Sequence, residues 1–289
     1  MAWKGYRLTY RALSPVHIGS YTLGYINLTR HYITGKAMWG AMTANLVRTG
    51  MVRSDYEACG NLLKTDVLIS YFFPALEPDK PLLPNFAKDG LRYGFDGEAM
   101  TAYQFEQKFI RSMGQTAIDY RTWSAEDQSL HESEYLIPKI QNGETFKELL
   151  FVGYLFVNDV GITQEVIRKA WSELFVGGER KYGWGRLLLD SETGITEMDT
   201  FFGYKSSSKC EKVPSFIVPA GRPVPAHVPV NERLKLKGDR ELLSTLEYDN
   251  EGRKGFGHKV GKEPILCWIP GSLLIEEASL SIGPYGIMV

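Results

Sequence analysis

The sequence predicts an α+β protein built on a ferredoxin-like antiparallel sheet with helices on one face, the sheet type that RNA-recognition modules also use. Across residues 1–199 the patterns run strand, helix, insert, strand, helix, glycine-rich loop and strand. Beyond residue 200, serine- and proline-rich stretches predict a smaller, strand- and loop-rich C-terminal lobe over 200–289. The chain has 289 residues and is 44% hydrophobic, which is enough to bury a core of this size.

Periodicity predicts the first strand and the first helix. Apolar and aromatic residues alternate with Arg7 and Arg11 over residues 6–13, which is the period of a half-buried strand with one basic face. Ala, Met and Leu recur at helical spacing over residues 36–50, and Gly50 is expected to end that helix.

The later elements of the core follow from the same patterns. Residues 144–157 have the apolar character of a strand. Thr163 is a suitable N-cap for a helix whose apolar stripe continues to Phe175, and residues 186–190 predict a short strand. The glycine-rich stretch 177–186 is therefore expected to lead from that helix into that strand.

Three stretches lack a regular pattern. Residues 14–35 are punctuated by proline and glycine and predict a long loop or a short hairpin. Four prolines between residues 74 and 84 exclude one continuous helix or strand there. Two hypotheses stay open for residues 200–289: a degenerate second ferredoxin-like half, or an extension that docks a partner.

The charge is distributed unevenly along the chain. The first acidic residue is Asp55, and the 54 residues before it carry seven Lys and Arg. Because the whole chain has a formal net charge of −1, the remainder must sum to −8. A basic segment of this length predicts binding to an anionic polymer.

Composition also limits the class of protein. No apolar run reaches the roughly 18 residues of a membrane span, and the N-terminal residues lack a signal-peptide pattern. Cys59, Cys210 and Cys267 are far apart and show no C-x-x-C spacing, which argues against a disulfide framework and a zinc site. We therefore expect a cytoplasmic protein without a metal or cofactor. The acidic residues between 124 and 136 are interpreted as the solvated face of a hairpin.

The glycine-rich stretch "GGERKYGWGR" is the strongest local signal. It fails the P-loop pattern because Gly183 is followed by Trp184 rather than Lys, and it lacks the third glycine of a dinucleotide-binding loop. Its glycines predict a nest of backbone N–H groups around phosphate, with cations beside it and aromatic rings for stacking on bases. The alternative is a helix C-cap followed by a tight turn. The predicted RNA-binding residues are Arg7, Arg11, His17, Gly19, Lys36, Trp39, Gly177, Gly178, Arg180, Lys181, Tyr182, Gly183, Trp184, Gly185 and Arg186.

Two histidines in the basic segment suggest a second kind of chemistry. His17 follows the first strand, and His31 precedes the first helix. Such residues transfer protons at the 2′-hydroxyl in metal-independent RNA cleavage. The alternative is that they are exposed or contact RNA without catalysing a reaction.

Three stretches together resemble the RAMP superfamily of CRISPR-associated proteins. "YRALSPVHIGSYTLGYINLTRHYITGKAMWGAM" is similar to the family's opening strand, its "SP.HIG" loop and its "I.G....GA" helix start. "TAIDYRTWSAEDQSLHESEYLIPKIQNGETFK" is similar to the segment "ID..T..A..G.LFE.E....G..F". "GGERKYGWGRL" is similar to the glycine-rich loop "GG.RS.G.GR", and the three occur in the family's order over about residues 6–189.

The resemblance implies an RNA-binding core within a guide-RNA ribonucleoprotein of antiviral defence. The length, the continuation beyond the glycine-rich loop and the "GKAMWGAM" helix most resemble subunits that cap the 5′ handle of the guide RNA. These pair with backbone subunits and with a large or effector subunit. The resemblance also implies a β-thumb within about residues 115–146, which wedges against the guide or its duplex and so contacts target nucleic acid.

The chain departs from the family pattern in several places. Tyr120 stands where the middle motif has Arg, Trp123 where it has Gly, and His131 where it has Phe. No Asp lies between Ser14 and Arg53, where target-cleaving backbone subunits carry a catalytic Asp. The glycine-rich loop is in mid-chain rather than near the C-terminus, unlike that of the guide-processing nucleases.

The sequence therefore supports one main hypothesis and two alternatives. The main hypothesis is a non-catalytic subunit that holds the 5′ handle of the guide RNA and supports assembly of the effector complex. The first alternative is a metal-independent guide-processing endoribonuclease that uses His17 or His31. The second is a backbone subunit repeated along the guide.

Overall fold

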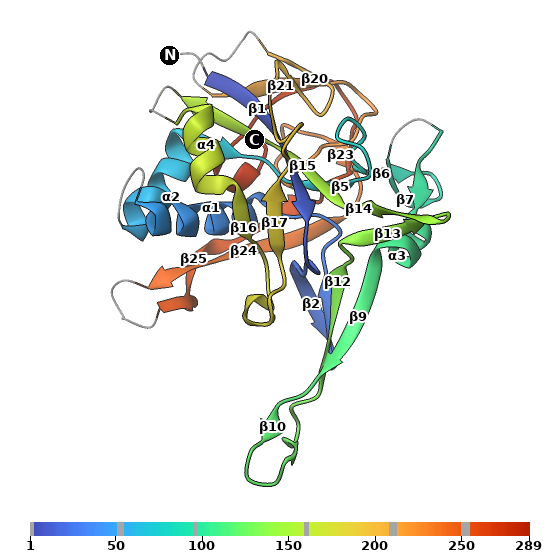
Figure 1. Cartoon of the computed structure of the whole chain (residues 1–289). Helices are drawn as coiled ribbons and strands as arrows, with labels where there is room; N and C mark the ends of the chain where they lie inside the picture. The colour runs from blue at the N-terminus through green and yellow to red at the C-terminus, as the bar shows by residue number, and fades with distance from the viewer. Residues whose placement is uncertain (1–2, 51–54, 95–96, 159–161, 208–212, 250–254) are drawn as a thin grey trace.

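A computed structural model describes residues 3–50, 55–94, 97–158, 162–207, 213–249 and 255–289 (Figure 1). It confirms the α+β class. At its centre is an antiparallel sheet of order β16-β17-β1-β15-β4, in which β18 also pairs with β1 and β5 with β15. Its strands are β1 (Trp3–Ala12), β4 (Val67–Ile69), β5 (Phe73–Ala75), β15 (Leu150–Asn158), β16 (Glu173–Phe175), β17 (Arg186–Leu189) and β18 (Ile195–Glu197).

Helices cover one face of this sheet, and the sequence signals for their ends are confirmed. The helices of this layer are α1 (Gly35–Thr49), α2 (Tyr56–Thr65) and α4 (Gln164–Trp171). Gly50 adopts a left-handed conformation after α1, and its N–H donates to the carbonyls of Leu46 and Val47. Thr163 is the N-cap of α4, because its hydroxyl accepts from the N–H of Val166.

The C-terminal lobe covers the other face of the sheet. On β15, Leu155 and Val157 belong to the cluster under the helices, whereas Tyr154 and Phe156 belong to a second cluster with residues of the lobe. This strand is consequently buried on both sides and reads as an unbroken apolar run. The sheet therefore has no open face of the kind that an isolated RNA-recognition module offers to RNA.

One predicted boundary is wrong. The helix that was expected to continue to Phe175 ends at Trp171, and Glu173–Phe175 instead form the edge strand β16 paired with β17. Leu174 is buried in the core. An apolar residue at this position is compatible both with the buried stripe of a helix and with the buried face of a strand. The glycine-rich stretch therefore connects two strands of a hairpin, with a 3₁₀ turn at Arg180–Tyr182, and does not follow a helix directly.

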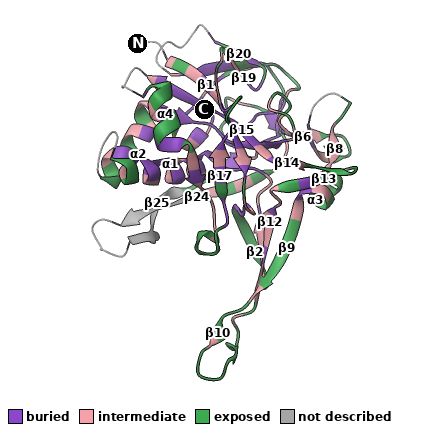
Figure 2. Ribbon diagram, in the orientation of Figure 1, coloured by how far each residue is buried: buried purple, intermediate pink, exposed green. Residues whose placement is uncertain are grey.

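A long β-hairpin over residues 110–136 projects away from the body of the molecule (Figure 1). Its base joins a four-stranded sheet of order β2-β3-β12-β9, so residues 19–29 form a hairpin within the stretch expected to be a loop or a hairpin. The strands are β2 (Gly19–Leu23), β3 (Ile26–Thr29), β9 (Ile110–Gln115) and β12 (His131–Leu136), with β10 (Ile118–Asp119) and β11 (Ser124–Ala125) near the tip. Figure 2 shows the distal part of this hairpin exposed, in contrast to the central sheet.

The remaining elements of the first 199 residues lie around the base of the projecting hairpin. A capping box formed by Thr101 and Gln104 starts α3 (Ala102–Phe109), which leads into β9. The predicted thumb range extends past this hairpin into a separate one, formed by β13 (Lys139–Asn142) and β14 (Thr145–Glu148). A three-stranded sheet precedes α3 and consists of β6 (Pro84–Ala87), β7 (Gly90–Tyr93) and β8 (Met100–Thr101).

In the described residues beyond 199, the structure has strands and one 3₁₀ turn, η2 (Pro284–Gly286), but no α-helix. A complete ferredoxin-like half has helices as well as strands, so a degenerate second half stays a prediction for this part. Its strands are β19 (Thr200–Phe201), β20 (Tyr204–Ser206), β21 (Ser215–Val218), β22 (Val228–Pro229), β23 (Leu236–Lys237), β24 (Arg240–Asp249), β25 (Gly255–Trp268), β26 (Leu273–Leu274) and β27 (Ala278–Ser281). The strands β24 and β25 form a second long hairpin.

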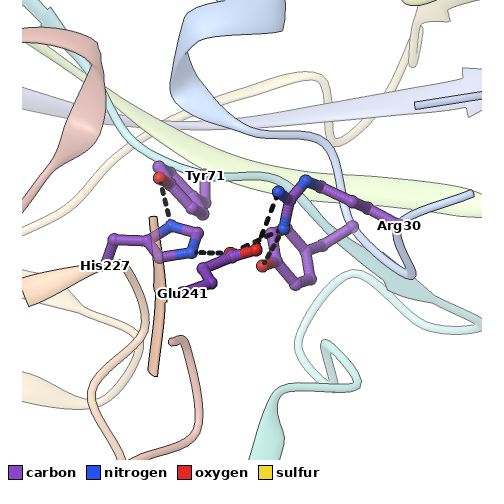
Figure 3. Close-up of polar contacts among 5 residues, drawn as sticks. Arg30, Tyr71, His227 and Glu241 are labelled. Atoms are coloured by element: carbon purple, nitrogen blue, oxygen red, sulfur yellow. Dashed lines mark hydrogen bonds and ion pairs between the residues drawn. The ribbon is translucent and has the colours of Figure 1, made fainter. Parts of the chain in front are cut away.

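A partly buried polar network joins the lobe to the N-terminal region (Figure 3). Arg30 donates two hydrogen bonds to the carboxylate of Glu241, of 2.7 and 3.0 Å. Glu241 also contacts Nε2 of His227, whose Nδ1 lies 2.6 Å from the hydroxyl of Tyr71. Burial alone raises the pKa of Glu241, but the hydrogen bonds from His227 and Arg30 outweigh it and lower that pKa to about 2.

Candidate nucleic-acid interface

Two of the family-like stretches meet at one edge of the sheet. Residues 14–19 lie against the glycine-rich loop, defined here as residues 176–185, and the two share backbone hydrogen bonds. The N–H of Gly178 donates to the carbonyl of His17 at 2.9 Å, and the N–H of Gly185 donates to that of Pro15 at 2.6 Å. Because β17 pairs with β1, the basic N-terminal segment lies beside this loop.

The remaining family-like stretch, which begins at Thr116, reaches the same edge through the base of the projecting hairpin. Val16 and Leu136 exchange two backbone hydrogen bonds, of 3.0 and 2.9 Å. Nδ1 of His17 lies 2.6 Å from the carbonyl oxygen of Glu134. Residues 14–19 are therefore held between the glycine-rich loop and the hairpin, so three distant segments form one surface.

The glycines of the loop have different roles. A Cβ at Gly177 would overlap the carbonyl of His17, and one at Gly185 would overlap the carbonyl of Val176. Both have positive φ angles, of 75° and 77°, so these two positions need glycine for conformation and for close packing. Gly183 also has a positive φ, of 82°, but a Cβ there would meet no atom within 4 Å. The alternative interpretation, a tight turn, accounts for the glycines at 177 and 185. The space beside Gly183 is open instead, so close packing does not explain the glycine there.

The tip of the glycine-rich loop carries exposed cations and one exposed ring. Arg180 and Lys181 are exposed, and the side chain of Tyr182 is 70% exposed. For the side chains of Arg180 and Lys181, the described residues supply no ion pair. Arg186, the first residue of β17 after the loop, is instead paired with Glu173 of the edge strand β16. The tip therefore presents two positive charges and an aromatic ring to a ligand.

Trp184 does not present its ring to solvent. Only 5% of the residue is exposed, and its ring packs edge-on against Tyr135 of β12 with the centroids 4.8 Å apart. In this conformation it fixes the loop to the projecting hairpin and is not available for stacking on a base, unlike Tyr182. No sequence pattern distinguishes Tyr182 from Trp184, which are two positions apart.

The two histidines have contrasting environments. His17 is 7% exposed, and Gly19 and Gly178 lie beside its ring, where a Cβ at either position would lie 3.7 to 3.8 Å from Nε2. His31 stacks on Phe105 with centroids 4.9 Å apart, and its Nδ1 lies 2.6 Å from the hydroxyl of Tyr93. Burial lowers the pKa of His31 to about 4, so its ring is neutral near pH 7. This environment disfavours His31 as a general acid.

The arginines of the predicted basic strand face have partners within the chain. Arg7 lies opposite Tyr154 in the sheet, on the side covered by the C-terminal lobe, and pairs with Asp79. Arg11 contacts Glu148 at 3.2 Å and Asp190 at 3.5 Å. These acids come from the later, acidic part of the chain, which is why the charge pattern of the first 54 residues alone did not reveal the pairing.

Lys36 and Trp39 on α1 hold the turn near residue 285. The ammonium of Lys36 lies 4.3 Å from the ring centroid of Trp39 and 4.1 Å from that of Tyr285. The indole of Trp39 donates to the carbonyl of Gly60 at 2.9 Å and meets Tyr285 edge-on at 5.2 Å. Cation–π contacts of this kind are stabilising, and they assign a packing role to both predicted RNA-binding residues.

The hairpin tip presents aromatic residues that the sequence patterns did not select as site residues. Tyr120 and Trp123 are each 79% exposed, and their rings meet edge-on with centroids 6.3 Å apart. Trp123 has a φ of 55°, a conformation that favours glycine. Both positions were already visible as departures from the family motif, and that was the signal that could have identified them.

The described residues provide no group of three or more His, Cys, Asp or Glu arranged to hold a metal ion. Within the same residues, no helix has the length and apolar character needed to span a bilayer. Cys59 and Cys267 are buried free thiols, and Cys210 lies outside the described residues.

The fold is similar to that of chains in solved ribonucleoprotein structures. No protein-family model matches this chain, and neither does any curated protein sequence. A chain in the cryo-EM structure of the Type III-B Cmr-beta bound to cognate target RNA and AMPPnP superposes with a TM-score of 0.57 and 14% identity, over 93% of this chain and 85% of that one. A chain in the Type III-B Cmr-beta structure bound to cognate target RNA gives a TM-score of 0.54 and 14% identity, over 93% and 86%. At this identity the comparison establishes a shared fold.

Proposed function

We propose that this chain is an RNA-binding subunit of a CRISPR effector ribonucleoprotein and that it holds the 5′ handle of the guide RNA. The observation that carries the proposal is the meeting of three family-like stretches, which are far apart in the sequence, at one edge of the sheet. Similarity of fold to chains of RNA-bound Type III-B Cmr-beta structures supports it.

A RAMP-type, ferredoxin-like core is part of this proposal. The antiparallel order β17-β1-β15-β4 supports it, with α1 following β1 and α4 following β15. The residues up to 199 supply this core. Residues 200–289 act as an extension that covers its second face and leaves the edge at the glycine-rich loop for RNA.

In this proposal the exposed turn of the glycine-rich loop holds RNA phosphates. Arg180 and Lys181 supply the charge, and Tyr182 supplies a ring for stacking. The projecting hairpin acts as the thumb, and Tyr120 and Trp123 at its tip contact the guide or the target strand. Other effector subunits and target nucleic acid are thus its further partners.

Binding without catalysis is the favoured form of the proposal. A metal-independent endoribonuclease is the alternative from the enzyme class. The observation in its favour is that the ring of His17 lies between Gly19 and the glycine-rich loop at Gly178, within the candidate interface. Incubation of the isolated chain with repeat RNA in EDTA separates the two. Discrete cleavage that His17→Ala abolishes would establish the enzyme. A repeated backbone subunit is distinguished by its copy number per complex.

The direct test removes the two exposed charges of the loop. We expect Arg180→Ala combined with Lys181→Ala to weaken retention of guide RNA by the purified complex in filter binding. For single strands, each phosphate contact contributes about −0.7 to the slope of log affinity against log salt concentration. The double variant should therefore have a slope that is less steep by about 1.4.

The matched control is Lys88→Ala combined with Arg168→Ala. These residues are also exposed, and the same two charges are lost at sites away from the glycine-rich loop. Equal RNA retention and equal salt slopes for the two double variants would contradict the assignment of the RNA site.

A further inference from the structure

A groove lies beside the glycine-rich loop. It has a volume of about 450 Å³ and lies between the C-terminal half of α1, the start of α2 and the end of β16. Ala44, Val47 and Phe175 supply its apolar lining. This volume lies within the range of about 300–1,000 Å³ that is typical of small-ligand sites.

Two arginines line this groove without an anionic partner among the described residues. Arg48 comes from the last turn of α1, and Arg180 comes from the exposed turn of the glycine-rich loop. Both are exposed. By contrast, Arg7, Arg11 and Arg186 all have carboxylates of this chain within ion-pair distance.

Two acidic residues of the neighbouring elements make other contacts. Glu173 pairs with Arg186, and the carboxylate of Asp55 accepts a hydrogen bond of 2.6 Å from the N–H of Ala58. Within the described residues, Arg48 and Arg180 thus have no carboxylate at ion-pair distance. An arginine in the last turn also offsets the helix dipole, but this effect does not account for the second arginine.

An aromatic ring completes the groove. Tyr56, the first residue of α2, lines it and is 57% exposed. An exposed ring beside guanidinium groups is the combination that holds a single-stranded nucleic acid, through stacking on a base and contacts with phosphate. An acidic protein segment needs the charges but not the ring.

We infer that this groove binds one nucleotide of single-stranded RNA, with a phosphate between Arg48 and Arg180 and a base against Tyr56. The inference rests on the proposed function, because Arg180 also belongs to the exposed turn of the glycine-rich loop. It extends the RNA path from that loop along α1, away from the projecting hairpin.

The experiment compares the full-length chain with Arg48→Gln, Tyr56→Ala and the control Arg168→Gln. Arg168 is an exposed arginine of α4 that does not line the groove. The probe is a short fluorescein-labelled single-stranded RNA of mixed sequence, titrated by anisotropy over a series of salt concentrations. A second probe carries 5-iodouridine for photocrosslinking, and the crosslinked peptides are identified by mass spectrometry.

We expect Arg48→Gln to make the slope of log affinity against log salt concentration less steep by about 0.7, and Arg168→Gln to leave that slope unchanged. A crosslink should map to Tyr56 in the native chain and disappear in Tyr56→Ala. Melting curves establish that each variant is folded, as expected for exposed side chains.

The outcomes separate this inference from the proposed function. If RNA binds and still depends on Arg180 and Lys181, but Arg48→Gln and Tyr56→Ala match the native chain, the groove inference is wrong and the proposed function stands. If the native chain binds no RNA at any salt concentration, both are overturned. Unchanged RNA binding together with weaker capture of a partner subunit would assign the groove to protein and overturn the inference.

Discussion

Two regions of the molecule use arginine in opposite ways. At the junction with the C-terminal lobe, Arg30 is largely buried and makes a two-point contact with Glu241. At the exposed turn of the glycine-rich loop, Arg180 has no such partner among the described residues. The difference teaches that the basic character of a segment is the sum of two populations: cations that hold the fold together and cations that are available to a ligand.

The largest effect should follow from breaking the buried junction. Arg30→Met leaves the carboxylate of Glu241 without its guanidinium partner in a partly buried site, and we expect the free energy of unfolding to fall by about 2–4 kcal/mol. Urea denaturation of the purified chain measures this. The control is Lys235→Met, which removes an exposed pair with Glu276 and should change stability by less than about 1 kcal/mol. Similar losses for both variants would show that the junction is not a special site.

The same junction should make stability depend on acid pH. The pKa of Glu241 falls from its ordinary 4.5 to about 2 in the folded chain. A depressed carboxylate pKa gives stabilisation that is complete above about pH 4.5 and is lost as the pH falls through about 2. Its size is on the order of 2 kcal/mol, because the 1.36 kcal/mol per pKa unit is reduced by solvent screening of a partly exposed carboxylate.

Denaturation curves between pH 2 and pH 6 measure this dependence, and Glu241→Gln removes the titrating group. We expect the native chain to lose stability relative to this variant as the pH falls. Parallel pH profiles for the two proteins would rule out the linkage.

A smaller effect should separate the two kinds of glycine in the loop. Gly183→Ala introduces a left-handed alanine into open space and should destabilise by about 1–2 kcal/mol. Gly185→Ala carries the same conformational penalty and also overlaps the carbonyl of Val176, so its loss should exceed that of Gly183→Ala by at least about 1 kcal/mol. Thermal melts of the pair measure the difference, and equal losses would mean that the loop relaxes at no cost.

Local patterns predicted the elements of the core better than their surroundings. The strand around Tyr6–Ala12, the N-cap at Thr163 and the helix end at Gly50 each depend on adjacent residues, and all three are confirmed. The strand Glu173–Phe175 was missed because three buried or half-buried residues fit either period.

The candidate site was harder to predict because exposure depends on distant residues. Arg7 is partnered by Asp79, Trp184 by Tyr135, and Lys36 by Tyr285. None of these contacts leaves a mark on the sequence near the site residue. Arg180 and Lys181 are exposed because a turn at the tip of a hairpin has few neighbours to cover its side chains.

The turn around Tyr285 has a consequence for how the molecule acquires its form. The backbone carbonyl of Tyr285 lies so close to Gly35 that a Cβ there would overlap it, although the two residues are about 250 positions apart. Contacts of such separation are slow to form, because the intervening chain must be organised first. We therefore expect the contact between the start of α1 and the turn at Tyr285 to form late in folding, after the chain between them is organised.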